Sequence, residues 1–135
     1  MKDTTFATHY GNIGKCYLLL ENYQMALKLV CKSYEAFTLG SLSYQDVHNI
    51  GYAAKWLSEI YRIIEPTNVM SLYFILCARN LWRNDMPIEA NKIDAYISSL
   101  PTSAANESII SLEAWQIQKH CNDFVTNTLS SKINL

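Results

Sequence analysis

Large and small residues alternate near the start of the chain in a way that constrains the fold more than any other feature. The segment reads Tyr10-Gly11-Asn12-Ile13-Gly14-Lys15-Cys16-Tyr17, followed by Asn22-Tyr23 and Ala26. Tyr10, Ile13 and Tyr17 are spaced to share one face of a helix. Gly14 marks a place where a second helix comes close, and Ala26, twelve residues on, is the small residue of that helix. The pattern predicts a tight helical hairpin.

The remaining sequence predicts four more helices after this hairpin. With only four Gly and three Pro in the chain, long helices are favoured over a turn-rich β sandwich. The expected helices are Thr4–Leu20, Tyr23–Phe37, Tyr44–Ile64, Val69–Trp82, Pro87–Leu100 and a sixth that starts after Thr102 or Ser103 and ends at Thr128. The expected ends are an Asp3 or Thr4 cap, a Glu21-Asn22 turn, a left-handed Gly40, a capping box from Ser43 to Asp46, and stops at Pro66 and Pro101.

Apolar stripes indicate which helix faces are buried. In the third helix the stripe recurs at spacings of 3 and 4; a coiled coil competes with this interpretation, but the stripe covers fewer than three heptads. The fourth helix is apolar nearly all round and is expected to be the most buried. The third-helix stripe is Val47, Ile50, Ala54, Leu57, Tyr61 and Ile64, and the sixth-helix stripe is Ile110, Ala114, Ile117, Cys121 and Phe124.

Composition bounds the class of protein. A chain of 135 residues suggests one domain, expected over residues 1–129, with 130–135 as a frayed tail. A net charge of −1 gives no reason to expect nucleic-acid binding, and no apolar run is long enough for membrane insertion. The four cysteines show no metal-ligand spacing, so buried free thiols in a reducing cytoplasm are expected, with no metal or cofactor.

The first hairpin resembles a tetratricopeptide repeat. Tyr10 stands in the large aromatic position of that family, Ile13-Gly14 replaces Leu-Gly, and Tyr17, Tyr23 and Ala26 fit. Thr38-Leu39-Gly40 stands where the family has a proline. The resemblance implies an all-α, right-handed α-solenoid of about six antiparallel helices, in roughly three hairpins.

Two registers of the repeat are open. In the first, Ala54-Leu57-Tyr61 repeats Tyr10-Ile13-Tyr17 with a period of 44, which resembles the extended repeats of bacterial peptide-sensing regulators. In the second, Ala78 and Ala90 repeat the spacing of Gly14 and Ala26. The first is slightly preferred because it alternates all six helices.

The resemblance also implies a groove lined by the first helix of each hairpin. Lysine and asparagine are the residue types with which some family members clamp a chaperone carboxylate, but their pattern here does not match that clamp. The groove residues are Thr8, Gly11, Asn12, Lys15, Leu18, Tyr52, Lys55, Glu59 and Arg62. Leu112 and Trp115 are expected to form a second interface, whereas Trp56 and Trp82 are expected to pack between helices.

No motif indicates catalysis. His9, His48 and His120 are far apart in sequence, and no phosphate-binding glycine loop or nucleophile elbow is present. The expected function is therefore non-enzymatic: an adaptor or small chaperone that binds a peptide or helix of a partner protein. The alternative is a sensory or oligomerisation domain of a larger transcriptional regulator or signalling protein. So short a stack is either part of a longer array or needs a cover, from a partner or in a homodimer.

Overall fold

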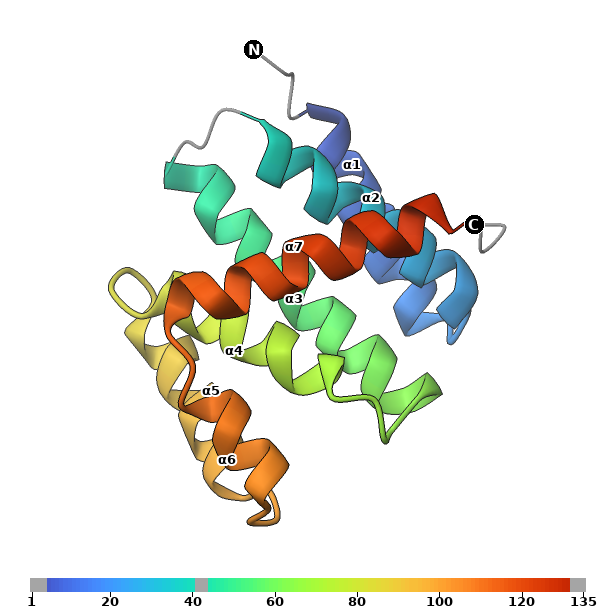
Figure 1. The fold of residues 1–135 in the computed structure, drawn as a ribbon. Coiled ribbons are helices and arrows are strands. Elements are labelled where there is room, and N and C mark those ends of the chain that lie inside the picture. Colours follow the sequence, from blue (N-terminus) through green and yellow to red (C-terminus); the bar gives the residue numbers. More distant parts are fainter. Residues whose placement is uncertain (1–4, 41–43, 132–135) are drawn as a thin grey trace.

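The computed structural model describes residues 5–40 and 44–131, which form seven α-helices and no strand (Figure 1). The all-α class expected from the sequence is confirmed. The helices are α1 (Thr5–Leu19), α2 (Tyr23–Leu39), α3 (Tyr44–Ile64), α4 (Met70–Trp82), α5 (Pro87–Ser98), α6 (Ala104–Ile110) and α7 (Ala114–Ser130). The expected cap at Asp3 or Thr4, Ser43 of the capping box and residues 132–135 of the tail lie outside the described residues.

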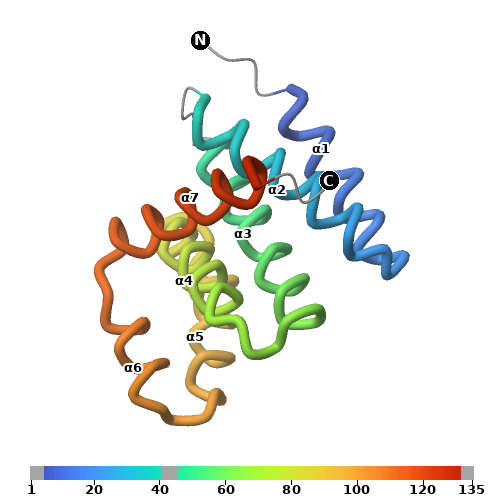
Figure 2. The backbone as a smooth tube through the Cα atoms, turned by 45° about the vertical axis from the view of Figure 1, so that its right-hand side comes forward, coloured from blue at the N-terminus to red at the C-terminus, as the bar shows by residue number. Residues whose placement is uncertain are grey.

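The first five helices pack in chain order, each against the next. The last helix departs from that order: α7 runs back across the molecule and packs on α2 and α4 (Figures 1 and 2). The short α6 contacts α4. A third hairpin that continues the stack in sequence was therefore a wrong expectation, because the apolar face of α7 is buried on the earlier helices instead.

The predicted sixth helix is broken in two between Ile110 and Ala114. Glu113 is extended (φ −71°, ψ 155°), and its carboxylate and the Gln116 side chain form a reciprocal capping box that starts α7. The hydroxyl of Ser111 donates to the Ser108 carbonyl at 2.8 Å, where α6 ends. The break lets α7 change direction. Of the predicted stripe Ile117 and Cys121 are buried, but Ala114 is exposed.

The face of α1 that packs on the rest of the molecule carries three small residues and one large one. Ala7, Gly11, Gly14 and Leu18 are buried, whereas Ile13 is 49% exposed. A Cβ at Gly14 would lie 3.2 Å from the Val30 nitrogen, so the glycine does permit close approach of α2. The contact lies one turn beyond Ala26, which is fully buried elsewhere on α2.

The core lies where α2, α3, α4 and α7 meet. As predicted, α4 is buried nearly all round, and its Phe74 ring stacks 6.1 Å from Tyr61 and meets Phe124 edge-on at 5.9 Å. Three cysteines are buried in this core, but Cys16 is exposed, contrary to expectation, because it lies on the outer side of α1.

Gly40 is extended (φ −83°, ψ 179°), so the predicted left-handed end of α2 was also wrong. Among the described helices, none has the length and apolar character needed to cross a bilayer.

Candidate functional site

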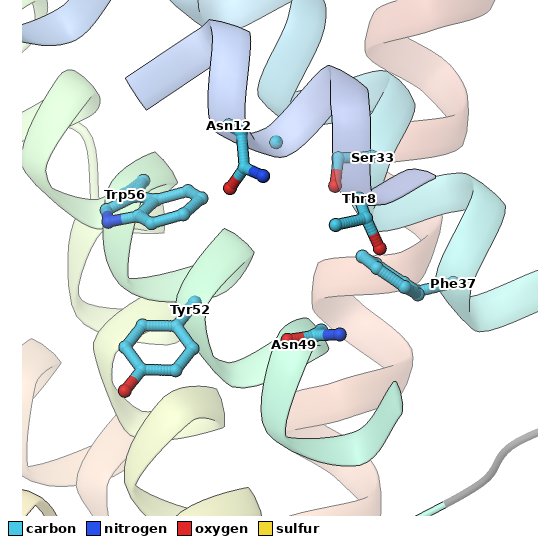
Figure 3. A pocket seen from close by; sticks show the side chains of 8 residues that line it. Thr8, Asn12, Ser33, Phe37, Asn49, Tyr52 and Trp56 are labelled. Atoms are coloured by element: carbon cyan, nitrogen blue, oxygen red, sulfur yellow. The ribbon is translucent and has the colours of Figure 1, made fainter. Parts of the chain in front are cut away.

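A first hollow opens between α1, α2 and α3, with a volume of about 270 Å³ (Figure 3). Each helix contributes residues three or four positions apart, which lie on one face of that helix. These are residues 8, 11 and 12 of α1, 33 and 37 of α2, and 49, 52 and 56 of α3. The lining residues are Thr8, Gly11, Asn12, Ser33, Phe37, Asn49, Tyr52 and Trp56.

Gly11 and Ser33 shape the floor of this hollow. A Cβ at Gly11 would lie 2.9 Å from the Ser33 hydroxyl and 3.5 Å from the Trp56 ring, so the glycine keeps the space open. The Ser33 hydroxyl donates a hydrogen bond to the Ala7 carbonyl at 2.7 Å, which joins α2 to α1 beneath the hollow. Both residues are buried.

The lining of the first hollow is uncharged. It offers aromatic faces from Phe37, Tyr52 and Trp56, together with amide and hydroxyl groups such as that of Asn12. The Lys15 ammonium lies 5.3 Å from the Trp56 ring centroid, within reach of a cation–π interaction. Such a lining suits an apolar or aromatic side chain together with peptide-like polar groups.

A second hollow of about 220 Å³ opens between α3, α4 and α5. Its chemistry differs, because it combines an apolar floor with five charged side chains, three basic and two acidic. Lys92 pairs with Glu89 at 3.4 Å, and the Arg62 guanidinium lies 5.4 Å from the Tyr96 ring centroid. The lining residues are Lys55, Ser58, Glu59, Arg62, Ile75, Trp82, Glu89, Lys92, Ile93 and Tyr96.

A row of aromatic rings joins the two hollows. Tyr52 lies between Trp56 of the first hollow and Trp82 of the second, with ring centroids 6.0 and 4.8 Å away. Trp82 is fixed in turn, because its indole nitrogen donates to the His48 carbonyl at 3.2 Å. A Cβ at Gly51 would overlap the indole of Trp82, so only glycine allows this packing. Trp82 is buried between helices as predicted, whereas Trp56 lines a hollow.

Most of the predicted groove residues meet in these hollows. Thr8, Gly11, Asn12 and Tyr52 line the first, and Lys55, Glu59 and Arg62 line the second. Lys15 lies beside the first over Trp56. Leu18 lines neither, because it is on the buried side of α1.

Sequence reasoning missed the walls supplied by the second helices of the hairpins. Ser33 and Phe37 of α2 line the first hollow, and Ile75 of α4 lines the second. A signal did exist for two other residues, because Asn49 and Trp56 flank Tyr52 at spacings of 3 and 4 and therefore share its face of α3.

The predicted second interface consists of two residues in different settings. Leu112 is half-buried in the turn between α6 and α7 and packs against the core. Trp115 is 63% exposed at the start of α7, where its indole nitrogen donates to the Glu113 carboxylate at 2.7 Å.

Burial keeps two thiols of the core in their neutral form. Burial raises the pKa of the Cys31 thiol to about 12, and burial also raises the pKa of the Cys121 thiol, so neither is a thiolate at neutral pH. The His120 ring stacks on Tyr73 with centroids 4.1 Å apart. Within residues 5–40 and 44–131, no three His, Cys, Asp or Glu side chains are grouped to hold a metal ion.

Comparison of the chain with protein-family models, with curated proteins and with solved structures gives no match.

Proposed function

We propose that the chain is a tetratricopeptide-like module that binds a peptide or helix of a partner protein along the side formed by α1, α3 and α5, without catalysis. The observation that carries the proposal is the pairing of two chemically different hollows on one shared wall, α3. Nine residues were expected in the groove. Seven of them lie in the hollows, four in the first and three in the second. The role is that of an adaptor or small chaperone.

The spacing of the hollows defines what the partner segment must offer. On α3, Tyr52 lines the first hollow and Glu59 lines the second. The two residues are seven positions apart, which corresponds to about 10 Å along a helix. The same span separates residues i and i+7 of a partner helix, or about three residues of an extended peptide. A ligand with an aromatic or apolar anchor and a charged anchor at that separation fits both.

Charge favours an acidic second anchor. The second hollow carries Lys55, Arg62 and Lys92 against Glu59 and Glu89, and Lys92 already pairs with Glu89. That leaves two cations and one carboxylate facing the ligand. A carboxylate held by a guanidinium gains charge-assisted hydrogen bonds.

Selection from a displayed peptide library tests the proposal. Enriched peptides are expected to share an aromatic or apolar residue and an acidic residue about 10 Å apart. Trp56→Ala and Arg62→Glu are each expected to weaken their binding by about 10- to 100-fold, as for central aromatic and arginine anchors.

Two matched variants serve as controls. Trp115→Ala removes an exposed tryptophan of α7, and Lys119→Glu reverses an exposed charge on the same helix, both outside the hollows. Each is expected to leave binding within about twofold. Binding that survives both Trp56→Ala and Arg62→Glu would contradict the site.

A further inference from the structure

The outer side of α1 carries an exposed apolar stripe that the proposed binding function does not use. Its members recur at spacings of 4, 3, 4 and 3, which is the spacing of a helix–helix seam. Phe6 is 66% exposed, Ile13 49% and Leu20 75%, and the two tyrosines are half-buried. We call these five residues the outer stripe: Phe6, Tyr10, Ile13, Tyr17 and Leu20.

The outer stripe faces away from both other sides of α1. The inward side, with Gly11 and Gly14, lies on α2, and the hollow lies on the side of Thr8, Asn12 and Lys15. At about 100° per residue, the stripe is turned some 120° from the inward side and further still from the hollow. Covering the stripe therefore leaves the hollow open.

The equivalent stripe of α3 is buried. Forty-four residues further along the chain, Ile50, Ala54, Leu57 and Tyr61 repeat the spacing of Phe6, Tyr10, Ile13 and Tyr17, and all four are at most 3% exposed. α3 is packed between α2 and α4, with α2 running antiparallel to it. The corresponding side of α1 has no such helix among the described residues. By this internal comparison, the outer stripe suits an antiparallel helix.

We propose that this helix is α1 of a second copy of the chain, in a symmetric antiparallel dimer. The stripe is close to self-complementary about Ile13. Phe6 and Leu20 each lie seven residues from Ile13, on opposite sides of it, while Tyr10 lies three residues before it and Tyr17 four residues after it. A two-fold axis at Ile13 places Ile13 on itself, Tyr10 against Tyr17 of the second copy, and Phe6 against its Leu20.

The charges of α1 do not oppose this pairing. Lys15 is the one Lys, Arg, Asp or Glu residue of α1, and it lies beside Trp56 on the hollow side. A dimer about Ile13 therefore brings no like charges of α1 together across the seam. A partner chosen by charge would need charged groups in the stripe, and the stripe holds none.

The exposed area indicates a weak dimer. Of five large side chains of about 150–250 Å² each, three are roughly half to three-quarters exposed and the two tyrosines are half-buried, so together they offer at most about 500 Å² of mostly apolar surface per copy. Standard stable interfaces bury about 800 Å² per partner. Lys32 of α2 lies beside the stripe, with its ammonium 5.8 Å from the Tyr10 ring centroid, and supplies part of the difference. The dimer is expected to dissociate in the micromolar range.

Sedimentation of the whole chain from about 1 μM to about 1 mM tests the proposal. The wild-type chain is expected to pass from monomer to dimer in this range. Ile13→Glu and Ile13→Lys are each expected to weaken the dimer by about 100-fold or more, because each places like charges at the axis. A mixture of the two variants is expected to dimerise again, because only a symmetric pairing brings position 13 of one copy onto position 13 of the other.

Controls separate this surface from the hollows and from misfolding. Ile88→Glu changes a 71% exposed isoleucine of α5 and is expected to leave the dimer unchanged. Because Ile13 is half-exposed, its variants are expected to keep their helical circular dichroism and their peptide binding, whereas Trp56→Ala keeps the dimer. A monomeric wild type throughout the range, a dimer insensitive to Ile13→Glu, or charge variants that do not associate when mixed would each overturn the proposal.

Discussion

At the scale of single residues, Glu21 has the most unusual backbone. Among described residues other than glycine, it alone has a positive φ, 61°. Its N–H donates to the Leu18 carbonyl at 3.0 Å, and the next N–H, of Asn22, donates to the Tyr17 carbonyl at 2.9 Å. This is the left-handed helix end that glycine usually supplies. The sequence predicted the turn, but a glutamate gave no sign of its conformation.

Glu21→Gly is therefore expected to stabilise the protein. The left-handed conformation costs a residue with a Cβ about 1–2 kcal/mol, and the greater freedom of glycine in the unfolded chain offsets part of the gain. The free energy of unfolding is expected to rise by about 0.5–1 kcal/mol in urea titrations. The control Glu107→Gly, inside α6, is expected to lower it by about 1 kcal/mol. Destabilisation by Glu21→Gly would show that the glutamate side chain matters more than its backbone.

At the scale of elements, a partly buried hydrogen bond joins α7 to α2. The Tyr34 hydroxyl, on a fully buried ring, donates to the Asn122 side-chain oxygen at 2.6 Å and lies 3.9 Å from the Cys77 sulfur. Tyr34→Phe is expected to lower the free energy of unfolding by about 1–2 kcal/mol, because it leaves the Asn122 acceptor without this partner.

A double-mutant cycle checks that this loss belongs to the contact between α2 and α7. Tyr34→Phe and Asn122→Ala are expected to couple by about 1 kcal/mol. Tyr23→Phe, at the half-buried start of α2, is expected to stay within about 0.5 kcal/mol of the wild type. Additive effects of Tyr34→Phe and Asn122→Ala would mean that α7 is held by its apolar stripe alone.

An ion pair connects α5 to the end of α4. Arg83 contacts both Asp94 oxygens, at 2.6 and 3.2 Å, and Arg79 lies 3.6 Å away. The hydrogen bond from Arg83 holds the pKa of the Asp94 carboxyl below its ordinary value. A lowered folded-state pKa means that the stabilisation is present above the unfolded pKa, near 3.9, and is lost as the pH falls through the folded value.

Asp94→Asn is accordingly expected to lower the free energy of unfolding at pH 7 by less than about 1 kcal/mol, because the carboxylate is partly exposed. The difference from the wild type is expected to disappear at a pH below the folded-state pKa of Asp94. Asp123→Asn, which breaks the more exposed pair with Lys119, is the control with a smaller effect. A difference that persists in acid would assign the effect to packing and not to charge.

The elements also show what local sequence can and cannot predict. Both ends of α3 agree with the prediction, which placed its start at a capping box whose first residue, Ser43, lies outside the described residues, and its end before Pro66. α5 begins at Pro87, as expected from a proline in the first helical turn. The break before α7 was missed, because a glutamate N-cap is an uncommon start signal. For α1 the sequence predicted the close approach of α2 at Gly14, but it did not indicate that the adjacent large residues stay outside, because only the packing of α2 decides which stripe is buried.

At the scale of the whole molecule, α7 decides which surfaces stay open. It covers α2 and α4, so the hollows beside α3 and the outer stripe of α1 remain accessible. The residues of the candidate site that lie on α1 and α3 could be predicted from helical spacing, because their side chains share a face within one helix. Its other walls, such as Phe37 and Trp82, did not, since the contacts that place them join residues far apart in the chain.

Thiol reactivity reports whether the core opens as one unit. Cys31, Cys77 and Cys121 are at most 1% exposed and come from α2, α4 and α7, whereas Cys16 is exposed. In dilute protein, where the proposed dimer does not shield Cys16, a thiol reagent at pH 8 is expected to label one cysteine quickly. The other three are expected to react together, at a common rate that rises with urea, because their helices form one cooperative core. Cys16→Ser is expected to abolish the fast phase. If Cys121 reacted ahead of Cys31 and Cys77, α7 would open separately, and the core of α2 and α4 would be stable without it.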